Sequence, residues 1–190
     1  MRKVVLYTLL SLDGAVDDPD RFFARDGERA EVPEFDTAMV DNEEEIIATQ
    51  DTVLLGRAMY DAWSRFWPTA EHQPFANFIN NVKKYVVTST PLSNTWHNAE
   101  PVHGPVEQVV RDLKARPGAD IGIHGSIQLA QSMLAAGLVD TLQLVVGPTM
   151  GFTGRKLFDG TDRPHRLDLV RARPTPSGAL LLTYHDRGRR

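Results

Sequence analysis

One stretch, residues 120–138, constrains the fold of this chain more than any other. It reads as a short apolar strand, a turn at Gly125 and an amphipathic helix that stops at Gly137. Ser126 suits the N-cap, because its hydroxyl can accept a hydrogen bond from a first-turn N–H group. A strand that meets a helix N-terminus across a glycine favours anion binding, since free amides and the helix dipole attract negative charge and a glycine lets a phosphate approach. A plain tight turn explains the same residues equally well, so the rest of the chain must decide.

Strand-like and helix-like segments alternate along the sequence. Runs of apolar and β-branched residues predict strands at residues 4–10, 52–55, 84–88, 120–124 and 140–146. Helices are expected at residues 33–47, 57–63, 74–81 and 105–114, and residues 166–173 and 179–185 predict a terminal hairpin. The alternation predicts an α/β fold with a mixed, mostly parallel sheet, helices on both faces and a C-terminal antiparallel hairpin. We expect one domain over residues 1–186, followed by a basic tail at 187–190.

Composition excludes several kinds of function. The chain has no cysteine, which excludes disulfides, thiolate catalysis, iron–sulfur clusters and cysteine zinc sites. Its six histidines show no short metal-ligand spacing, so no metal is expected. A net charge of -4 offers no general attraction to nucleic acid or to an anionic membrane. The N-terminal apolar run is too short to span a membrane and lacks a small-residue cleavage site, which favours a cytoplasmic protein.

Polar groups follow four of the expected strands. They lie at residues 11–14, 56–57, 88–90 and 124–126. Ligands of such sheets bind outside the carboxyl ends of the strands, so these groups should gather along one edge. Arg57 carries a fork-shaped cation suited to phosphate, although an exposed arginine in a first helical turn is an alternative. Together the groups suit a ligand with phosphates at two places, such as NADP, while the absence of G-x-G-x-x-G disfavours an ordinary Rossmann dehydrogenase.

The motifs at these positions also resemble a known family. Three of them resemble the dihydrofolate reductase fold: S-L-D-G at 11–14, L-L-G-R-x-M-Y at 54–60 and V-V-T-S-T at 86–90. Three later ones are similar to the reductase domain of the riboflavin-biosynthesis deaminase/reductase: G-S-I-x-L at 125–129, G-L-V-D-x-L at 137–142 and P-x-x-G-x-x-G-x-x-L-F at 148–158. The resemblance covers nearly the whole chain. It implies a dihydrofolate reductase-like three-layer sandwich, NADPH as hydride donor and a homodimer.

Carried over residue by residue, the resemblance implies cofactor contacts in four places. The adenosine-phosphate side would have Gly56, Arg57 and Met59, and the 2′-phosphate would lie beside Thr88, Ser89 and Thr90. The pyrophosphate would be cradled by the motif that contains Gly125, Ser126, Ile127 and Leu129. The nicotinamide would lie near Tyr7, Thr8 and the loop 13–17, which includes Val16 and Asp17. The cysteines and the H-x-E motif of the deaminase are absent, so any activity is that of a reductase alone.

The proton donor has several candidates. Asp13 could donate or position the proton, although an aspartate before a glycine more often belongs to a turn. Dihydrofolate reductases also place one carboxylate on the first helix. Asp36, Asp41 and Glu43 all lie near that place, and none matches it securely. The acidic residues 43–45 as a group are expected to lie mostly in water.

The substrate end of the cleft is expected to be built by the loops 15–33 and 63–74. Phe35, Trp63 and Trp67 could form walls for an aromatic substrate, or could simply pack in the core or in a lid. The terminal hairpin and the loop 147–158 are the expected dimer surfaces, by resemblance.

Three functions therefore remain open. The leading one is an NADPH-dependent reductase of a small heterocycle or carbonyl compound, such as a pteridine or an aminopyrimidine riboside. The second places a flavin or deazaflavin in the same cleft, and the third is a non-catalytic nucleotide-binding module. All three involve a small-molecule partner, and none involves nucleic acid or a membrane. Placement of Arg57 and Gly125 on opposite sides of the molecule would exclude the reductase.

Overall fold

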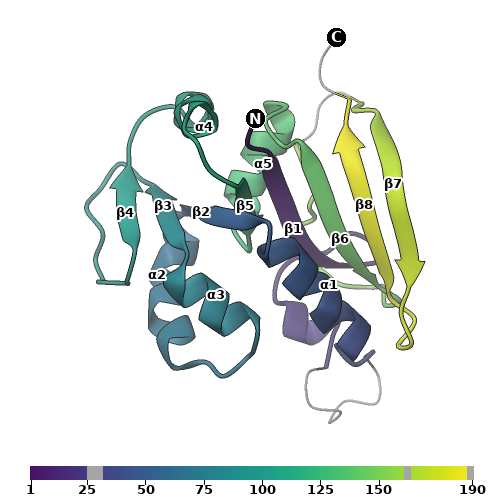
Figure 1. The fold of residues 1–190 in the computed structure, drawn as a ribbon. Coiled ribbons are helices and arrows are strands. Elements are labelled where there is room, and N and C mark those ends of the chain that lie inside the picture. The colour runs from purple at the N-terminus through teal and green to yellow at the C-terminus, as the bar shows by residue number, and fades with distance from the viewer. Residues whose placement is uncertain (25–31, 161–163, 188–190) are drawn as a thin grey trace.

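The chain folds around one sheet of eight strands, described here from a computed structural model for residues 1–24, 32–160 and 164–187. Their order is β4-β3-β2-β5-β1-β6-β8-β7 (Figure 1). The strands are β1 (Val4–Ser11), β2 (Gln50–Gly56), β3 (Lys83–Val87), β4 (Ala99–Val102), β5 (Asp120–His124), β6 (Thr141–Gly147), β7 (Leu167–Pro174) and β8 (Leu180–Asp186). Every neighbouring pair from β4 to β6 is parallel, whereas β8 is antiparallel to both β6 and β7. The predicted mixed sheet with a C-terminal hairpin is confirmed.

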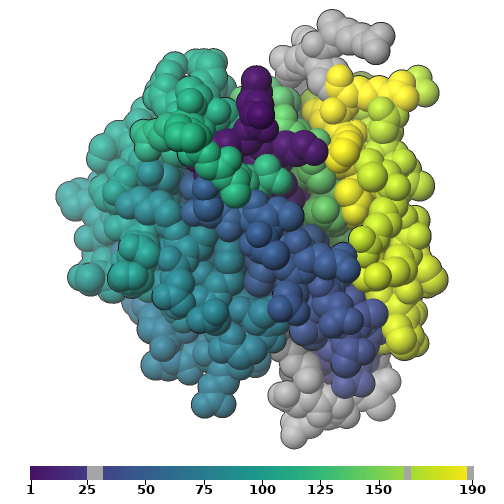
Figure 2. Space-filling model, in the orientation of Figure 1, coloured from purple at the N-terminus to yellow at the C-terminus, as the bar shows by residue number. Residues whose placement is uncertain are grey.

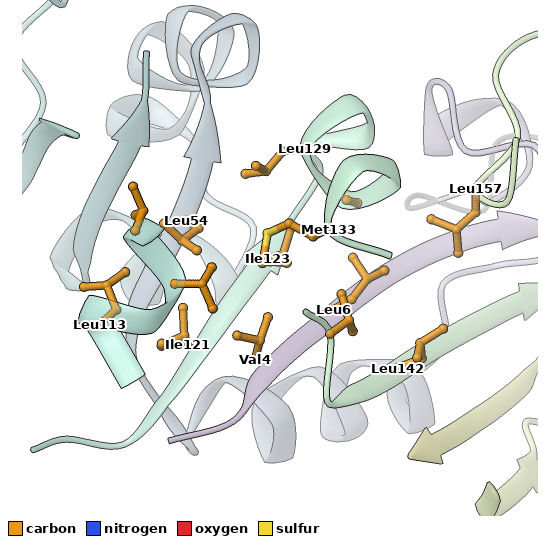
Figure 3. Packing of buried hydrophobic residues seen from close by; sticks show 14 of the residues in the cluster. Val4, Leu6, Leu54, Leu113, Ile121, Ile123, Leu129, Met133, Leu142 and Leu157 are labelled. Carbon is orange, nitrogen blue, oxygen red and sulfur yellow. The ribbon is translucent and has the colours of Figure 1, made fainter. Parts of the chain in front are cut away.

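Helices cover both faces of the sheet, which confirms the predicted three layers. They are α1 (Thr37–Ile47), α2 (Arg57–Phe66), α3 (Phe75–Asn81), α4 (Val106–Ala115) and α5 (Ile127–Ala135), with short 3-10 turns η1 (Pro19–Arg21) and η2 (Trp67–Thr69). On one face, α4 and α5 pack Leu113, Leu129 and Met133 against strand residues Val4, Leu6, Ile121 and Ile123 (Figure 3). Alternate residues of β1 and β2, such as Val5, Tyr7 and Val53, pack under α1 and α3 on the other face, because successive strand side chains point to opposite sides.

Helix α1 begins later than predicted and buries a residue that was expected in water. The carboxylate of Asp36 accepts a hydrogen bond from the Met39 amide (3.1 Å), so the helix starts at Thr37 and not near Pro33. Met39, Glu43 and Ile46 share one helical face, which turns toward the sheet. Glu43 is therefore only 8% exposed, and its predicted exposure is wrong. Elsewhere on α1, the exposed Glu45 pairs with Arg171 of β7 (3.1 Å), and the helix and the terminal hairpin adjoin at the surface (Figure 2).

Two further elements differ from the predictions. Strand β4 was not expected, because Ala99–Val102 is short and contains a proline. It pairs with β3 alone, at the edge of the sheet, where a missing backbone N–H is tolerated. The aromatic segment after Trp63 was expected to be a loop, but α2 continues to Phe66 and is followed directly by η2.

The long segment before α1 is fastened to the body by aromatic residues. Phe22 and Phe23 are fully buried and pack edge to face on one another (5.6 Å between ring centres). Val16 and Leu12 donate backbone hydrogen bonds to Arg155 and Thr149 (3.1 and 2.8 Å), which joins this segment to the loop after β6. Part of the predicted loop, residues 25–31, and the end of the predicted tail, 188–190, lie outside the described residues.

Candidate functional site

The carboxyl ends of the parallel strands bring the predicted site groups to one edge of the sheet. The amide of Gly56, at the end of β2, donates a hydrogen bond to the hydroxyl of Ser126, at the end of β5 (3.0 Å). Helix α2 begins at Arg57 and α5 begins at Ile127, so the two helix starts lie side by side. Arg57 and Gly125 thus lie at the same edge of the sheet. The placement on opposite sides of the molecule that would exclude a reductase is therefore not found.

The start of α5 differs in detail from the prediction. The Ser126 side chain makes no cap hydrogen bond to its own helix, because its hydroxyl is used by Gly56. The amides of Ser126 and Ile127 are held inside the turn by the carbonyls of His124 and Gly125 (2.7 and 2.9 Å). Among the described residues, the amides of Gln128 and Leu129 have no acceptor. These two amides are the donors that remain for an anion, while the Leu129 side chain packs in the core.

Gly125 is required by packing and by its backbone conformation. Its φ is +64°, a region that favours glycine. A Cβ at this position would lie 2.6 Å from Cζ2 of Trp63 and 3.2 Å from Cε of Met59. The space left by the missing side chain therefore admits α2, whereas we expected it to admit a phosphate.

The guanidinium of Arg57 bridges α2 and the segment after β3. Its Nε donates to the Asp61 carboxylate (2.8 Å), and its Nη1 donates to Thr90 Oγ1 and to the Pro91 carbonyl (both 2.7 Å). Burial tends to raise the pKa of Asp61, but the hydrogen bonds from Arg57 and Ser93 lower it on balance. Nη2 of Arg57 has no acceptor in the part of the chain that the structure describes. The cation is thus oriented, with one nitrogen left for a ligand.

An open pocket of about 410 Å³ lies next to this segment. It is lined by Val87, Thr88, Ser89, His103 and Gly104. Thr88 and Ser89, two of the residues expected at a 2′-phosphate, therefore line an open pocket. The hydroxyl of Thr90 is engaged by Arg57, and that of Thr88 donates to the Thr90 carbonyl (3.1 Å) and accepts the Thr90 amide (3.2 Å).

A second pocket, of about 320 Å³, lies between the sheet and α1, α2 and α3. Nine residues of the predicted site line it, namely Tyr7, Thr8, Val16, Asp17, Met59, Trp63, Trp67, Gly125 and Ile127. One wall is aromatic, since the rings of Trp63 and Phe75 lie 5.6 and 4.9 Å from that of Trp67, centre to centre. Phe35 is not part of this wall, because it packs edge-on against Phe23 (6.2 Å between centres). We refer to this space as the aromatic pocket.

The structure distinguishes the three carboxylates near the first helix. Asp36 is used structurally, since it caps α1 and also accepts the amide of Ser177 (3.0 Å). Asp41 is exposed. Glu43 is buried and lines the aromatic pocket. Sequence reasoning did not select it, although its spacing from Met39 and Ile46 places it on the buried face of the helix.

Asp13 lies in a turn and not in the aromatic pocket. Its carboxylate accepts hydrogen bonds from the Ser11 hydroxyl (2.6 Å) and from the Gly151 amide (3.3 Å). The Ser11 hydrogen bond is the main cause that lowers the pKa of Asp13. A carboxylate held ionised outside the pocket does not suit a proton donor, so the turn interpretation fits the geometry better.

At the mouth of the pocket, Asp17 is tied to the loop after β6. It accepts the amide of Arg155 (2.6 Å) and the guanidinium Nε of the same residue (2.8 Å), and these bonds lower the pKa of Asp17. Asp17 and Arg155 both line the aromatic pocket, so this ion pair forms part of its rim.

Within residues 1–24, 32–160 and 164–187, no three histidine, aspartate or glutamate side chains come together as metal ligands. None of the helices over the same residues has the length and apolar character needed to cross a membrane.

Comparison with known proteins agrees with the fold. The model of the RibD C-terminal domain family matches residues 2–181. YyaP of Bacillus subtilis (strain 168) is 26% identical over 194 residues, which cover 98% of this chain and 96% of YyaP. A diaminohydroxyphosphoribosylaminopyrimidine deaminase/5-amino-6-(5-phosphoribosylamino)uracil reductase from Thermotoga maritima has a TM-score of 0.67 at 15% identity, over 97% of this chain and 56% of that one. Dihydrofolate reductase from Enterococcus faecalis, in complex with NADP(H), has a TM-score of 0.61 at 17% identity, over 97% and 96% of the two chains.

Proposed function

Because the chain belongs to the RibD C-terminal domain family and shares its fold with dihydrofolate reductase, we propose that it is an NADPH-dependent reductase of a small heterocyclic or carbonyl compound. The observation that carries the proposal is the hydrogen bond from the Gly56 amide to Ser126 Oγ (3.0 Å). This bond fixes the starts of α2 and α5 beside each other, at the edge where both pockets open. When bound, NADPH would supply the hydride.

The residues present suit the phosphates of this cofactor. The free amides of Gln128 and Leu129 lie at the N-terminus of α5, where the helix dipole favours a pyrophosphate. Arg57 keeps Nη2 for a second phosphate, and Thr88 and Ser89 line the neighbouring open pocket. The chain thus offers phosphate donors at two places, as a 2′-phosphorylated dinucleotide requires.

The aromatic pocket suits the reacting end of the cofactor together with the substrate. Thr8, Val16 and Ile127 line it together with Gly125, which supports a position of the nicotinamide near the start of α5. Trp63, Trp67 and Phe75 also line the pocket, and their rings would exclude water from a flat substrate.

Glu43 is the carboxylate that we assign to proton handling. It is buried and lines the aromatic pocket, whereas Asp13 lies outside the pocket and is held ionised by Ser11. A carboxyl group in this position can hold a proton at its oxygen against the substrate. This assignment replaces Asp13 and selects one of the three carboxylates that the sequence left open near the first helix.

Cofactor preference tests the proposal. NADPH should raise the melting temperature in a saturable way and by more than NADH does. Arg57→Ala should remove most of this preference, lowering NADPH affinity about tenfold or more with little effect on NADH, because the guanidinium acts on the 2′-phosphate. Arg65→Ala is the matched control, since Arg65 is an exposed cation in the last turn of the same helix. Equal shifts with both cofactors, no shift, or equal losses in the two variants would contradict the proposal.

Turnover is the second measurement. NADPH oxidation should be detectable with at least one member of a panel of pteridines, aminopyrimidine ribosides and quinones. Tight NADPH binding without oxidation of NADPH by any of them would favour the non-catalytic module, and a coloured protein after purification would favour a flavin.

A further inference from the structure

A further pocket lies between α1 and the terminal hairpin, two elements that adjoin in Figure 2. Its volume is about 230 Å³, and its lining includes Lys3, Asp120 and Thr141, which lie at or just before the starts of β1, β5 and β6. The candidate functional site lies at the opposite, carboxyl ends of the parallel strands, and the aromatic pocket shares no lining residue with this space. It is therefore a separate site, and we refer to it as the polar pocket.

The sheet face that α1 covers changes from apolar to polar at this pocket. Here β6 and β8 carry four polar side chains in two registered pairs, Thr141–His185 and Gln143–Thr183. The next pair on the same face, Val145 and Leu181, is apolar and buried in the core. The Gln143 amide and the Thr183 hydroxyl bond to each other (2.7 Å), so that pair partly satisfies itself. A face under a helix is normally apolar, so packing alone does not explain the change.

Two polar side chains of the lining, Asn42 and Thr141, are buried without a hydrogen-bond partner. They are 7% and 5% exposed, and neither side chain has a partner among the described residues. Their polar atoms nevertheless keep some exposed surface, because they are not closed off beneath the lining of the pocket. A buried polar group without a partner lowers stability, and leucine or valine at these positions would avoid that cost. A molecule in the pocket that pairs with both groups would offset it.

The lining favours an uncharged molecule that carries hydroxyl groups. The Asn42 amide offers both a donor and an acceptor, and the Thr141 hydroxyl can act as either. A ligand hydroxyl also donates and accepts, so it suits both side chains whichever way the amide is turned. The charged side chains of the lining balance, with two cations and two anions, namely Lys3, Arg171, Glu45 and Asp120. The pocket therefore attracts neither a cation nor an anion in particular.

The size and the walls of the pocket favour a small ligand that is not aromatic. Its volume of about 230 Å³ lies below the roughly 300–1,000 Å³ of pockets for drug-sized ligands. No phenylalanine, tyrosine or tryptophan is among the described residues that line it. A flat heterocycle would thus lack the stacking that the aromatic pocket offers.

We propose that the polar pocket binds a small, uncharged, polyhydroxylated molecule of about the size of a monosaccharide. Its hydroxyl groups pair with Asn42 and Thr141, and its carbon skeleton lies against Val5 and Ile46, the buried apolar residues of the lining. The site does not depend on the proposed function, because it lies away from the cofactor and substrate pockets.

Chemical-shift titrations of the full chain, labelled with nitrogen-15, test the ligand class. Glucose, xylitol and myo-inositol are the neutral probes, and glucuronate, glucosamine and myo-inositol 1-phosphate are the charged ones. At least one neutral probe should shift the backbone amides of Asn42 and Thr141 in a saturable way. The tightest neutral probe should bind at least about fivefold tighter than the tightest charged one. A tighter charged probe would overturn the proposal, as would no saturable shift with any neutral probe, which would leave the pocket to water alone.

Two variants test the contacts. Asn42→Leu and Thr141→Val remove the polar atoms and nearly keep the size of the side chain, and each should weaken the tightest neutral probe about tenfold. Asn77→Leu is the matched control, since it makes the same change at an exposed asparagine of α3, and it should leave the affinity unchanged. Either variant suffices if the other does not fold. Wild-type affinity in a folded Asn42→Leu or Thr141→Val would overturn the proposal.

The outcome for the proposed function is separate. The neutral probe should bind equally with and without NADPH, because the two pockets have no lining residue in common. Displacement of the probe by NADPH would place it in the reductase cleft and overturn the proposal. A chain that binds the probe but shows no thermal shift with NADPH would contradict the reductase and support the polar pocket.

Discussion

The bond between Gly56 and Ser126 can be removed by deleting one atom. Ser126→Ala keeps the Cβ and loses only Oγ, which accepts the Gly56 amide at 3.0 Å. Ser126 is 5% exposed, so water does not readily replace the lost acceptor. A buried donor left without a partner costs about 1–3 kcal/mol. We expect the lower half of this range, about 1–2 kcal/mol, because Gly56 itself is only half-buried. For a chain of this length the melting temperature should fall by roughly 2–8 °C.

The same substitution should weaken cofactor binding. The bond sets the spacing between Arg57 and the free amides at the start of α5, so its loss makes the phosphate donors less preorganised. We expect about a tenfold loss of NADPH affinity, measured by titration, beside the stability loss measured by urea unfolding.

Ser132→Ala is the matched control for this experiment. Ser132 lies on the same helix, is exposed, and its hydroxyl donates only to the Gln128 carbonyl within the helix (2.9 Å). Its loss should change stability by less than about 0.5 kcal/mol and leave NADPH affinity unchanged. Wild-type stability and wild-type NADPH affinity in Ser126→Ala would refute the argument that this bond holds the site together.

Three other changes have defined outcomes. Glu43→Gln should lower kcat at least tenfold and leave NADPH affinity within about twofold, measured by steady-state kinetics and titration. Lys84 is fully buried with Nζ on the carbonyls of Ile79 and Val82 (both 2.8 Å), and burial lowers its pKa to about 8 from 10.5. Between these values the unfolded chain binds more protons than the folded one, so urea unfolding should show stability rising with pH by at most about 3 kcal/mol, and Lys84→Met should lack this rise. Gly122→Ala should lower the melting temperature, because the new Cβ would lie 2.0 Å from Oε1 of Gln50 and 2.7 Å from Nε2 of His124, and the double variant with Gln50→Ala should recover only part of that loss because the contact with His124 stays.

The failures of sequence reasoning have identifiable physical causes. Strand β4 was not predicted, because a four-residue segment with a proline carries no strand signal. Its place at the edge of the sheet is what allows a proline in the strand. The burial of Glu43 was not predicted, because a carboxylate among three glutamates is normally solvated, although its helical position points inward. Ser126 was assigned to the local helix, since a serine before an apolar run usually caps it.

The sequence by itself determined the alternation of elements, the mixed sheet and the edge at which polar groups gather. These follow from local signals, namely hydrophobic periodicity, turn residues and the rule that parallel strands end on the same side. Only the tertiary structure decided which atoms meet. The acceptor for Gly56 lies 70 residues away at Ser126, and the partner of His124 lies 74 residues away at Gln50. Such pairs depend on the packing of whole helices against the sheet, which no local pattern encodes. That packing also opens the aromatic pocket and brings Glu43 into its lining.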